Sequence, residues 1–186
     1  MTQKQQSFLN VLLLEQRKCF EHEISSIEAA FMKRVAVFPG SFDPVSSGHI
    51  HIAQKASNLF DEVFIAIGEN TSKQCMFNID KRLQWIKHAT AQMKNIHVVC
   101  FTGLTVELCR KIDARFIARG VRNASDLEYE RAIADTNLRL APEIQTVFLL
   151  SDPDQTSVRS TILRELIRNK SDVSMFLPAG IDVYAK

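Results

Sequence analysis

Short apolar runs and amphipathic helical patterns alternate along most of this 186-residue chain. The runs are rich in Val, Ile and Phe and almost continuously apolar, which is typical of strands buried on both faces of a sheet. Strands are expected at 34–38, 62–67, 96–100, 115–118 and 146–150, and helices at 48–58, 79–91, 105–111, 124–140, 160–168 and 179–184. This alternation predicts an α/β fold built on a doubly wound, five-stranded parallel sheet.

Residues 1–32 precede the alternating part of the chain. The stretch up to Phe31 contains neither glycine nor proline, and its apolar residues recur mostly three or four positions apart. This spacing predicts an amphipathic helical extension, followed by a single α/β domain over residues 33–186. Two explanations of the extension stay open: a helix that packs on the domain or mediates assembly, or an alternative translation start at Met32.

Composition excludes several classes of protein. The formal net charge of +2 gives no reason to expect nucleic acid or an anionic membrane as a partner. The four cysteines lack CxxC spacing, which disfavours a zinc site and a disulfide framework and favours a reducing, cytoplasmic location. The apolar run 11–14 is far too short for a signal peptide or a membrane span.

The loop after the first expected strand, 39–49, carries the clearest chemical signal. A glycine there lets the backbone approach a ligand closely, and Ser41 offers a hydroxyl at the strand end. Ser46 or Ser47 can cap the following helix, whose N-terminus attracts phosphate. His49 then falls in the first helical turn, where it can donate to a phosphate oxygen. The alternative is a histidine that only packs under the loop, but the strand, loop and helix start together favour a phosphate-binding role.

Basic residues follow two other expected strands. Lys73 lies in a loop of small polar residues, and it is either a solvated charge or a mobile contact to a substrate phosphate. Arg119 and Arg122 flank a glycine just past the fourth strand, with Asp126, Glu128 and Glu130 on the next helix. A salt-bridge network between loop and helix is one interpretation. The glycine favours the other, in which the guanidinium groups bind phosphate oxygens.

Two segments carry a family resemblance. Pro39-Gly-Ser-Phe-Asp-Pro-x-x-x-Gly-His49 resembles the signature of the HxGH nucleotidylyltransferase superfamily, with Ser46 at the first position of the tetrad. The segment 119–130 resembles the RG-(L/V)-R…D-x-E-Y-E segment of the phosphopantetheine adenylyltransferases, and the likeness extends from about residue 33 to 177. It implies a Rossmann-like fold. It also implies transfer of the adenylyl group of ATP to 4′-phosphopantetheine, which forms dephospho-coenzyme A and pyrophosphate in coenzyme A biosynthesis.

The resemblance also implies roles for individual residues. His49 is expected to act in catalysis as a transition-state stabiliser. The residues expected to bind phosphopantetheine are Ser41, Lys73, Thr105 and Arg119. Those expected to bind ATP are Ser41, Phe42, His49, Gly120, Val121, Arg122, Glu130, Gln155, Thr156, Ser157, Val158, Arg159, Ser160 and Thr161.

The segment 155–161 departs from the family pattern. Gln155 stands where the family has tryptophan, and Arg159 replaces the first serine of the helix start. The overlapping segment 158–164 resembles the I-S-x-T-x-x-R element of nicotinamide mononucleotide adenylyltransferases, with Arg164 as its arginine. That family is the alternative, although it does not account for segment 119–130. A silent nucleotide-binding module of the same fold is a further alternative, which the presence of His49, Lys73 and Arg119 disfavours.

The expected reaction is direct. The phosphate of phosphopantetheine attacks the α-phosphorus of ATP in line, and the protein contributes positioning and electrostatic stabilisation. Magnesium bridging the ATP phosphates is implied as the cofactor, without a dedicated carboxylate cage in the sequence. Membership of the family further implies a homo-oligomer, commonly a hexamer, acting on small molecules.

Overall fold

The computed structural model describes residues 33–69, 74–152 and 159–184, and the part from Arg34 onward is one compact unit. Its sheet has five parallel strands in the order β3-β2-β1-β4-β5. The strands are β1 (Val35–Gly40), β2 (Glu62–Gly68), β3 (Ile96–Phe101), β4 (Phe116–Val121) and β5 (Gln145–Leu150). The predicted fold class is confirmed, and each strand lies within three residues of its expected bounds.

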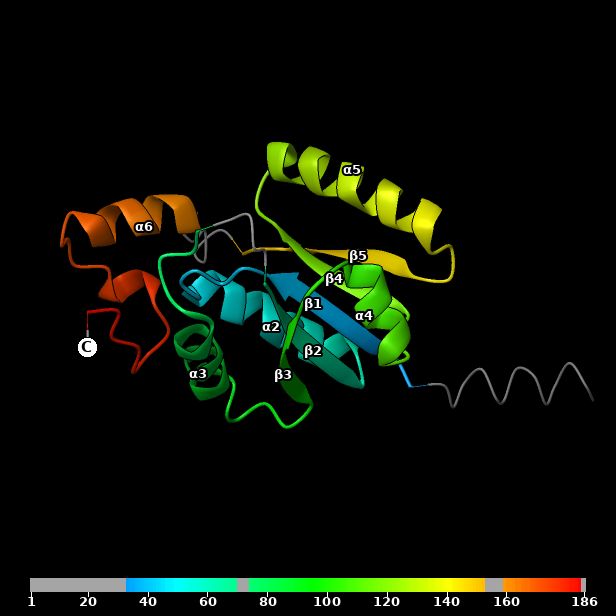
Figure 1. Cartoon of the computed structure of the whole chain (residues 1–186), viewed down its shortest axis with the longest axis horizontal. Coiled ribbons are helices and arrows are strands. Elements are labelled where there is room, and N and C mark those ends of the chain that lie inside the picture. The colour runs from blue at the N-terminus through cyan, green and yellow to red at the C-terminus, as the bar shows by residue number, and fades with distance from the viewer. Residues whose placement is uncertain (1–32, 70–73, 153–158, 185–186) are drawn as a thin grey trace, which may run out of the picture. The chain divides into compact units, whose positions relative to one another are not determined.

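Helices cover both faces of the sheet (Figure 1). They are α2 (Ser47–Leu59), α3 (Ile79–Ala89), α4 (Thr105–Lys111), α5 (Ala124–Leu140) and α6 (Ser160–Arg168), as the sequence predicted to within two residues. Side chains of β1 alternate between two cores: Ala36 and Phe38 pack with α2 and α3, whereas Val35 and Val37 pack with α4. No helix in the described ranges is long and apolar enough to cross a membrane.

The chain reverses its winding between β1 and β4. It runs outward from β1 to β3, then crosses back through α4 to β4 on the other side of β1. Only Ala36 and Val37 of β1 pair with β4, so the two strands separate toward their carboxyl ends. Such a topological switch point opens a crevice at the strand ends, where open α/β sheets bind ligands.

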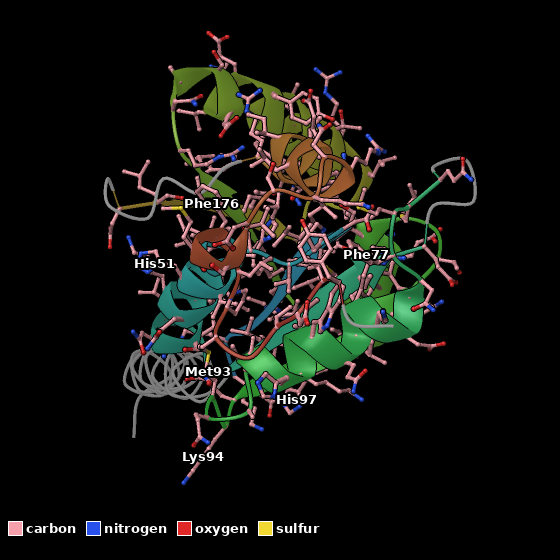
Figure 2. The ribbon with its side chains drawn as sticks, turned by 90° about the vertical axis from the view of Figure 1, so that its left-hand side faces the viewer. His51, Phe77, Met93, Lys94, His97 and Phe176 are labelled. Atoms are coloured by element: carbon pink, nitrogen blue, oxygen red, sulfur yellow. The ribbon has the colours of Figure 1, made fainter. Side chains whose placement is uncertain are left out.

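The C-terminal segment corrects one prediction. Residues 179–184 form no helix; a short 3-10 helix (Ser174–Phe176) and a turn occupy this end. Gly180 has a φ of 78°, a left-handed value that interrupts a helix, while Ile181 and Val183 alternate inward at 9% and 6% exposure. Figure 2 labels Phe176 and Phe77, two half-buried rings packed on the core that this segment joins.

Candidate active site

Two cavities open at the carboxyl ends of β1 and β4. One, of about 240 Å³, is lined by the loop after β1, the start of α2 and the arginine segment at the end of β4. The other, of about 690 Å³, extends over α4 and α5. They share one wall, made of Pro39, Gly40, Ser41, Arg119 and Glu130. Two ligands in these cavities would therefore meet beside Ser41 and Arg119.

His49 occupies the third position of α2, as the sequence predicted, and lines the smaller cavity. Its Nδ1 accepts the backbone N–H of Ser46, the N-cap residue, at 3.0 Å, and the Ser46 hydroxyl lies 3.1 Å from the same nitrogen. Because Nδ1 is an acceptor, the proton of the neutral ring is on Nε2. Burial, reinforced by the positive charges of Arg122 and Arg119, lowers the pKa of His49 to about 4. His49 is thus a neutral donor at pH 7.

The Phe42 side chain packs against this histidine. Its ring is only 2% exposed and meets the His49 ring edge to face at 5.1 Å and the Phe38 ring at 5.5 Å. Its φ of 48° turns the chain sharply between Ser41 and Asp43. The predicted contact of Phe42 with ATP stays a prediction. In the structure, the Phe42 ring packs against the His49 ring.

Both arginines of the β4 segment are held by carboxylates of α5. Arg119 forms a two-pronged pair with Glu130 at 2.6 Å and 2.6 Å and also donates to the Pro39 carbonyl at 2.7 Å. Arg122 Nε lies 2.7 Å from Asp126. The salt-bridge network considered from the sequence is therefore present. It holds both guanidinium groups at the rim of the smaller cavity.

Gly120 stands between these arginines for a steric reason. A Cβ added there would lie 2.8 Å from Cγ1 of Ile52 on α2. The glycine thus lets the end of β4 approach α2 closely and brings the arginine segment next to the helix that carries His49. Val121 turns inward and is 1% exposed, so only its backbone can serve a ligand.

The start of α6 lies beside the smaller cavity. Ser160 lines the smaller cavity, and Ser160 and Thr161 line a neighbouring cavity of about 570 Å³ together with Arg122 and Arg159. Arg159 donates to Asp126 at 3.1 Å, so Asp126 holds two arginines. Lys73, Gln155, Thr156, Ser157, Val158 and residues 1–32 lie outside the described residues.

The larger cavity contains residues that the sequence pattern did not single out. Thr105, expected to contact phosphopantetheine, lines this cavity beside Leu104, and three residues of α5 that were not expected, Ile133, Ala134 and Asn137, also line it. Glu130 and Asn137 are seven positions apart, with Ile133 and Ala134 between them, which is the spacing of one helical face. This spacing, continued from Glu130, could have identified them.

Comparison with known proteins identifies the family. The family described as cytidylyltransferase-like matches residues 37–166. A phosphopantetheine adenylyltransferase from Flavobacterium psychrophilum is 44% identical over 150 residues, which are 81% of this chain and 99% of that protein. Another, from Lacticaseibacillus casei, is 45% identical over 157 residues, or 83% of this chain and 94% of that protein. The chain belongs to the phosphopantetheine adenylyltransferase family.

More distant structures share the fold of this adenylyltransferase family. A bifunctional NMN adenylyltransferase/ADP ribose pyrophosphatase from Francisella tularensis superposes with a TM-score of 0.61 at 17% identity, covering 81% of this chain and 46% of that one. At this identity the likeness concerns the fold alone. The family that the sequence motifs predicted is confirmed by the two bacterial relatives, which match at much higher identity.

The described residues offer this adenylyltransferase site no preformed metal cage. None of them form a group of three or more His, Cys, Asp or Glu side chains suited to a metal ion. The two carboxylates beside the smaller cavity, Asp126 and Glu130, are paired with arginines.

Proposed function

We propose that this chain transfers the adenylyl group of ATP to 4′-phosphopantetheine, giving dephospho-coenzyme A and pyrophosphate. The observation that carries the proposal is the shared wall between the two cavities. The smaller cavity is lined by His49, by Arg119 and Arg122, and by the starts of α2 and α6, which suit a nucleoside triphosphate. The larger cavity extends over α4 and α5. A phosphate entering from the second cavity would reach Ser41 and Arg119, where the first cavity begins.

On the nucleotide side, His49 donates its Nε2–H to an α-phosphate oxygen as negative charge develops there. The N-terminus of α2 adds backbone N–H groups of the same polarity. Because the attacking phosphate oxygen is already anionic, no general base is needed, and a neutral His49 fits the role. Arg122, Arg159, Ser160 and Thr161 would hold the β- and γ-phosphates that leave as pyrophosphate.

On the acceptor side, Ser41 and Arg119 would orient the attacking phosphate, with Lys73 reaching it from its loop. Glu130 fixes the guanidinium plane of Arg119, so its orientation is set before a substrate arrives. Thr105, Leu104 and the inner face of α5 would line the path of the pantetheine arm. An oxygen–phosphorus bond forms at the α-phosphate as the bond to pyrophosphate breaks, with no covalent enzyme intermediate.

Magnesium fits this scheme as an ion that arrives with ATP. Both nearby carboxylates are paired with arginines, so the ATP phosphates and water would supply the ligands. Bound there, the ion would neutralise charge on the leaving pyrophosphate. Chelation should therefore abolish turnover without changing the thermal stability of the ligand-free protein.

The assay is pyrophosphate release from ATP with three acceptor conditions: phosphopantetheine, nicotinamide mononucleotide, and none. Release only with phosphopantetheine supports the proposal. Release only with nicotinamide mononucleotide would establish the alternative family activity. ATP binding in calorimetry without release under any condition would identify a silent module.

The alternative family activity depends on Arg164. In the structure, this arginine donates to the Asp43 carbonyl and to the Thr161 hydroxyl.

We also propose a cytoplasmic homo-oligomer, a hexamer by family resemblance. Cys75, Cys100 and Cys109 are free thiols, in keeping with a reducing location. None of the residues of α5 are buried, and the helix exposes Leu127, Tyr129, Leu138 and Leu140. Such apolar side chains on one long helix suit contacts between subunits. Sedimentation velocity of the full chain tests the subunit number.

A further inference from the structure

We infer that Asp43 and Arg82 are positioning residues that hold the segment Met76–Phe77 against Ser41 and thereby set the geometry of the acceptor-phosphate site. This inference rests on the proposed function. We call the pair the Asp43–Arg82 clamp. Neither side chain lines the two cavities that meet at Ser41, and neither role follows from the sequence resemblance.

Asp43 joins the loop after β1 to the segment that precedes α3. Its side chain is buried, and one carboxylate oxygen accepts the Met76 N–H at 2.8 Å while the other accepts the Phe77 N–H at 2.9 Å. Charge-assisted hydrogen bonds of this length are stronger than neutral ones. Each oxygen has its own backbone donor, so the carboxylate fixes both the distance and the rotation of the segment.

Arg82 makes the reciprocal connection from α3. The residue is 4% exposed, and its guanidinium donates to the Ser41 carbonyl at 2.7 Å and to the Phe77 carbonyl at 3.1 Å. One rigid fork thus spans both segments that Asp43 joins. Because the planar guanidinium group binds one backbone carbonyl in each segment, it fixes the distance between the two segments.

The clamp also meets the nucleotide side of the site. Arg164 of α6 donates to the backbone carbonyl of Asp43 at 2.8 Å. A cavity of about 380 Å³ lies beside this contact, lined by Ser41, Asp43, Gln74, Cys75, Thr161, Arg164 and Arg168. Ser41 thus stands on a loop that is held from α3 and from α6 at once. Loosening the clamp would move Ser41 relative to the segment that follows the expected phosphate-binding lysine.

The test uses Asp43→Asn and Arg82→Lys in the full chain. An asparagine amide offers one acceptor oxygen for two N–H groups, and a lysine cannot span two carbonyls as a planar fork does. Asn95→Ala is the matched control. Asn95 is half-buried and, like Arg82, donates to two backbone carbonyls, those of Ser57 at 2.8 Å and Phe60 at 3.1 Å, but it precedes β3 at the other end of the sheet.

Three measurements separate positioning from general stability. The KM for phosphopantetheine should rise about tenfold in both clamp variants, as expected for one lost hydrogen bond to a charged group. The Kd for ATP should change less than about threefold. Trp85, the only tryptophan of the chain, packs 4.8 Å from the Phe77 ring, so acrylamide quenching of its emission should increase in the clamp variants and not in Asn95→Ala.

An unchanged acceptor KM in folded Asp43→Asn and Arg82→Lys would overturn the inference. So would equal losses in both substrates that Asn95→Ala reproduces, because these would indicate only general destabilisation. If the wild-type protein turned over no phosphopantetheine, the proposed function itself would fail. In that case calorimetric binding of phosphopantetheine and Trp85 quenching still decide the inference, and unchanged values of both in the clamp variants would refute it.

Discussion

His49→Ala should slow turnover about a hundred- to a thousandfold. The structure gives His49 one donor for the substrate, Nε2–H, because Nδ1 is occupied by the Ser46 N–H. Loss of one preorganised donor to a developing charge costs about 3–4 kcal/mol of transition-state stabilisation. The Kd for ATP should rise less than tenfold, since arginines and helix N-termini still bind the phosphates. Single-turnover pyrophosphate release measures the first quantity and calorimetry the second.

The depressed pKa of His49 makes this prediction sharper. With a pKa of about 4, the ring is neutral throughout the range from about pH 5.5 to 8, and its titration should leave no limb there in the pH profile of kcat/KM, which reports the groups of the free enzyme. The acceptor phosphate titrates near pH 6 and can produce a limb of its own. His49→Asn separates the two sources: a limb present in both proteins belongs to the substrate. A limb near pH 6.5 that only the wild type shows would refute the assignment of His49 as a neutral donor.

The same pKa predicts how stability depends on pH. A folded-state value of about 4 against an ordinary value of 6.5 means that the unfolded chain binds a proton first as the pH falls. The wild type should therefore lose stability relative to His49→Asn between about pH 6.5 and 4, by at most about 3 kcal/mol, and the loss should stop below pH 4. Urea unfolding of both proteins across this range measures the difference. A constant difference across the range would contradict the burial argument.

Three further substitutions test the framework of the site. Glu130→Gln removes the charge that orients Arg119 and should cost about 1–3 kcal/mol in urea unfolding and raise the acceptor KM; unchanged values of both would argue against preorganisation. Gly120→Ala places a methyl group against Ile52, which should lower the free energy of unfolding by about 1–3 kcal/mol and lower kcat. Unchanged values of both would show that the close approach of β4 to α2 is not required. Gly180→Ala, at a φ of 78°, should lower the melting temperature but leave kcat unchanged in the folded protein, and a changed kcat would show that the C-terminal turn affects the site.

The arrangement of the elements was predictable because it depends on local pattern. The apolar runs are strands, largely buried in β1, β2 and β4 and half-buried in the edge strands β3 and β5. Asn78 caps α3 with its side chain, accepting the Lys81 N–H as expected for that residue at a helix start. The prediction of a helix at 179–184 was wrong because the apolar pattern there is ambiguous. Ile181 and Val183 alternate with exposed residues after a turn at Gly180. The conformation of a C-terminal segment that packs on the core is determined by its tertiary contacts and not by a helical spacing of apolar residues.

The chemistry of the candidate site was predictable in part. The positions of His49 and the arginine segment follow from motifs at strand ends. The contacts that hold the loop carrying Ser41 do not, because Asp43 accepts from Met76 and Phe77, 33 and 34 positions later in the chain, and Arg164 donates to a carbonyl 121 positions earlier. Contacts over such separations depend on the completed sheet. The packing of the Phe42 ring against His49 was likewise not predicted from the motif, whereas its contact with ATP stays a prediction.

The two interpretations of the arginine segment, a salt-bridge network or a phosphate contact, are compatible in one geometry. A guanidinium group carries five N–H donors, and the contacts described for Arg119 use three of them, two on Glu130 and one on the Pro39 carbonyl. The remaining donors lie on its two terminal nitrogens, at the wall that both cavities share. Glu130 therefore orients the cation without using all its hydrogen-bonding capacity. A phosphate that docks there meets donors already held in place, which lowers the ordering cost of binding and favours the geometry required for in-line transfer.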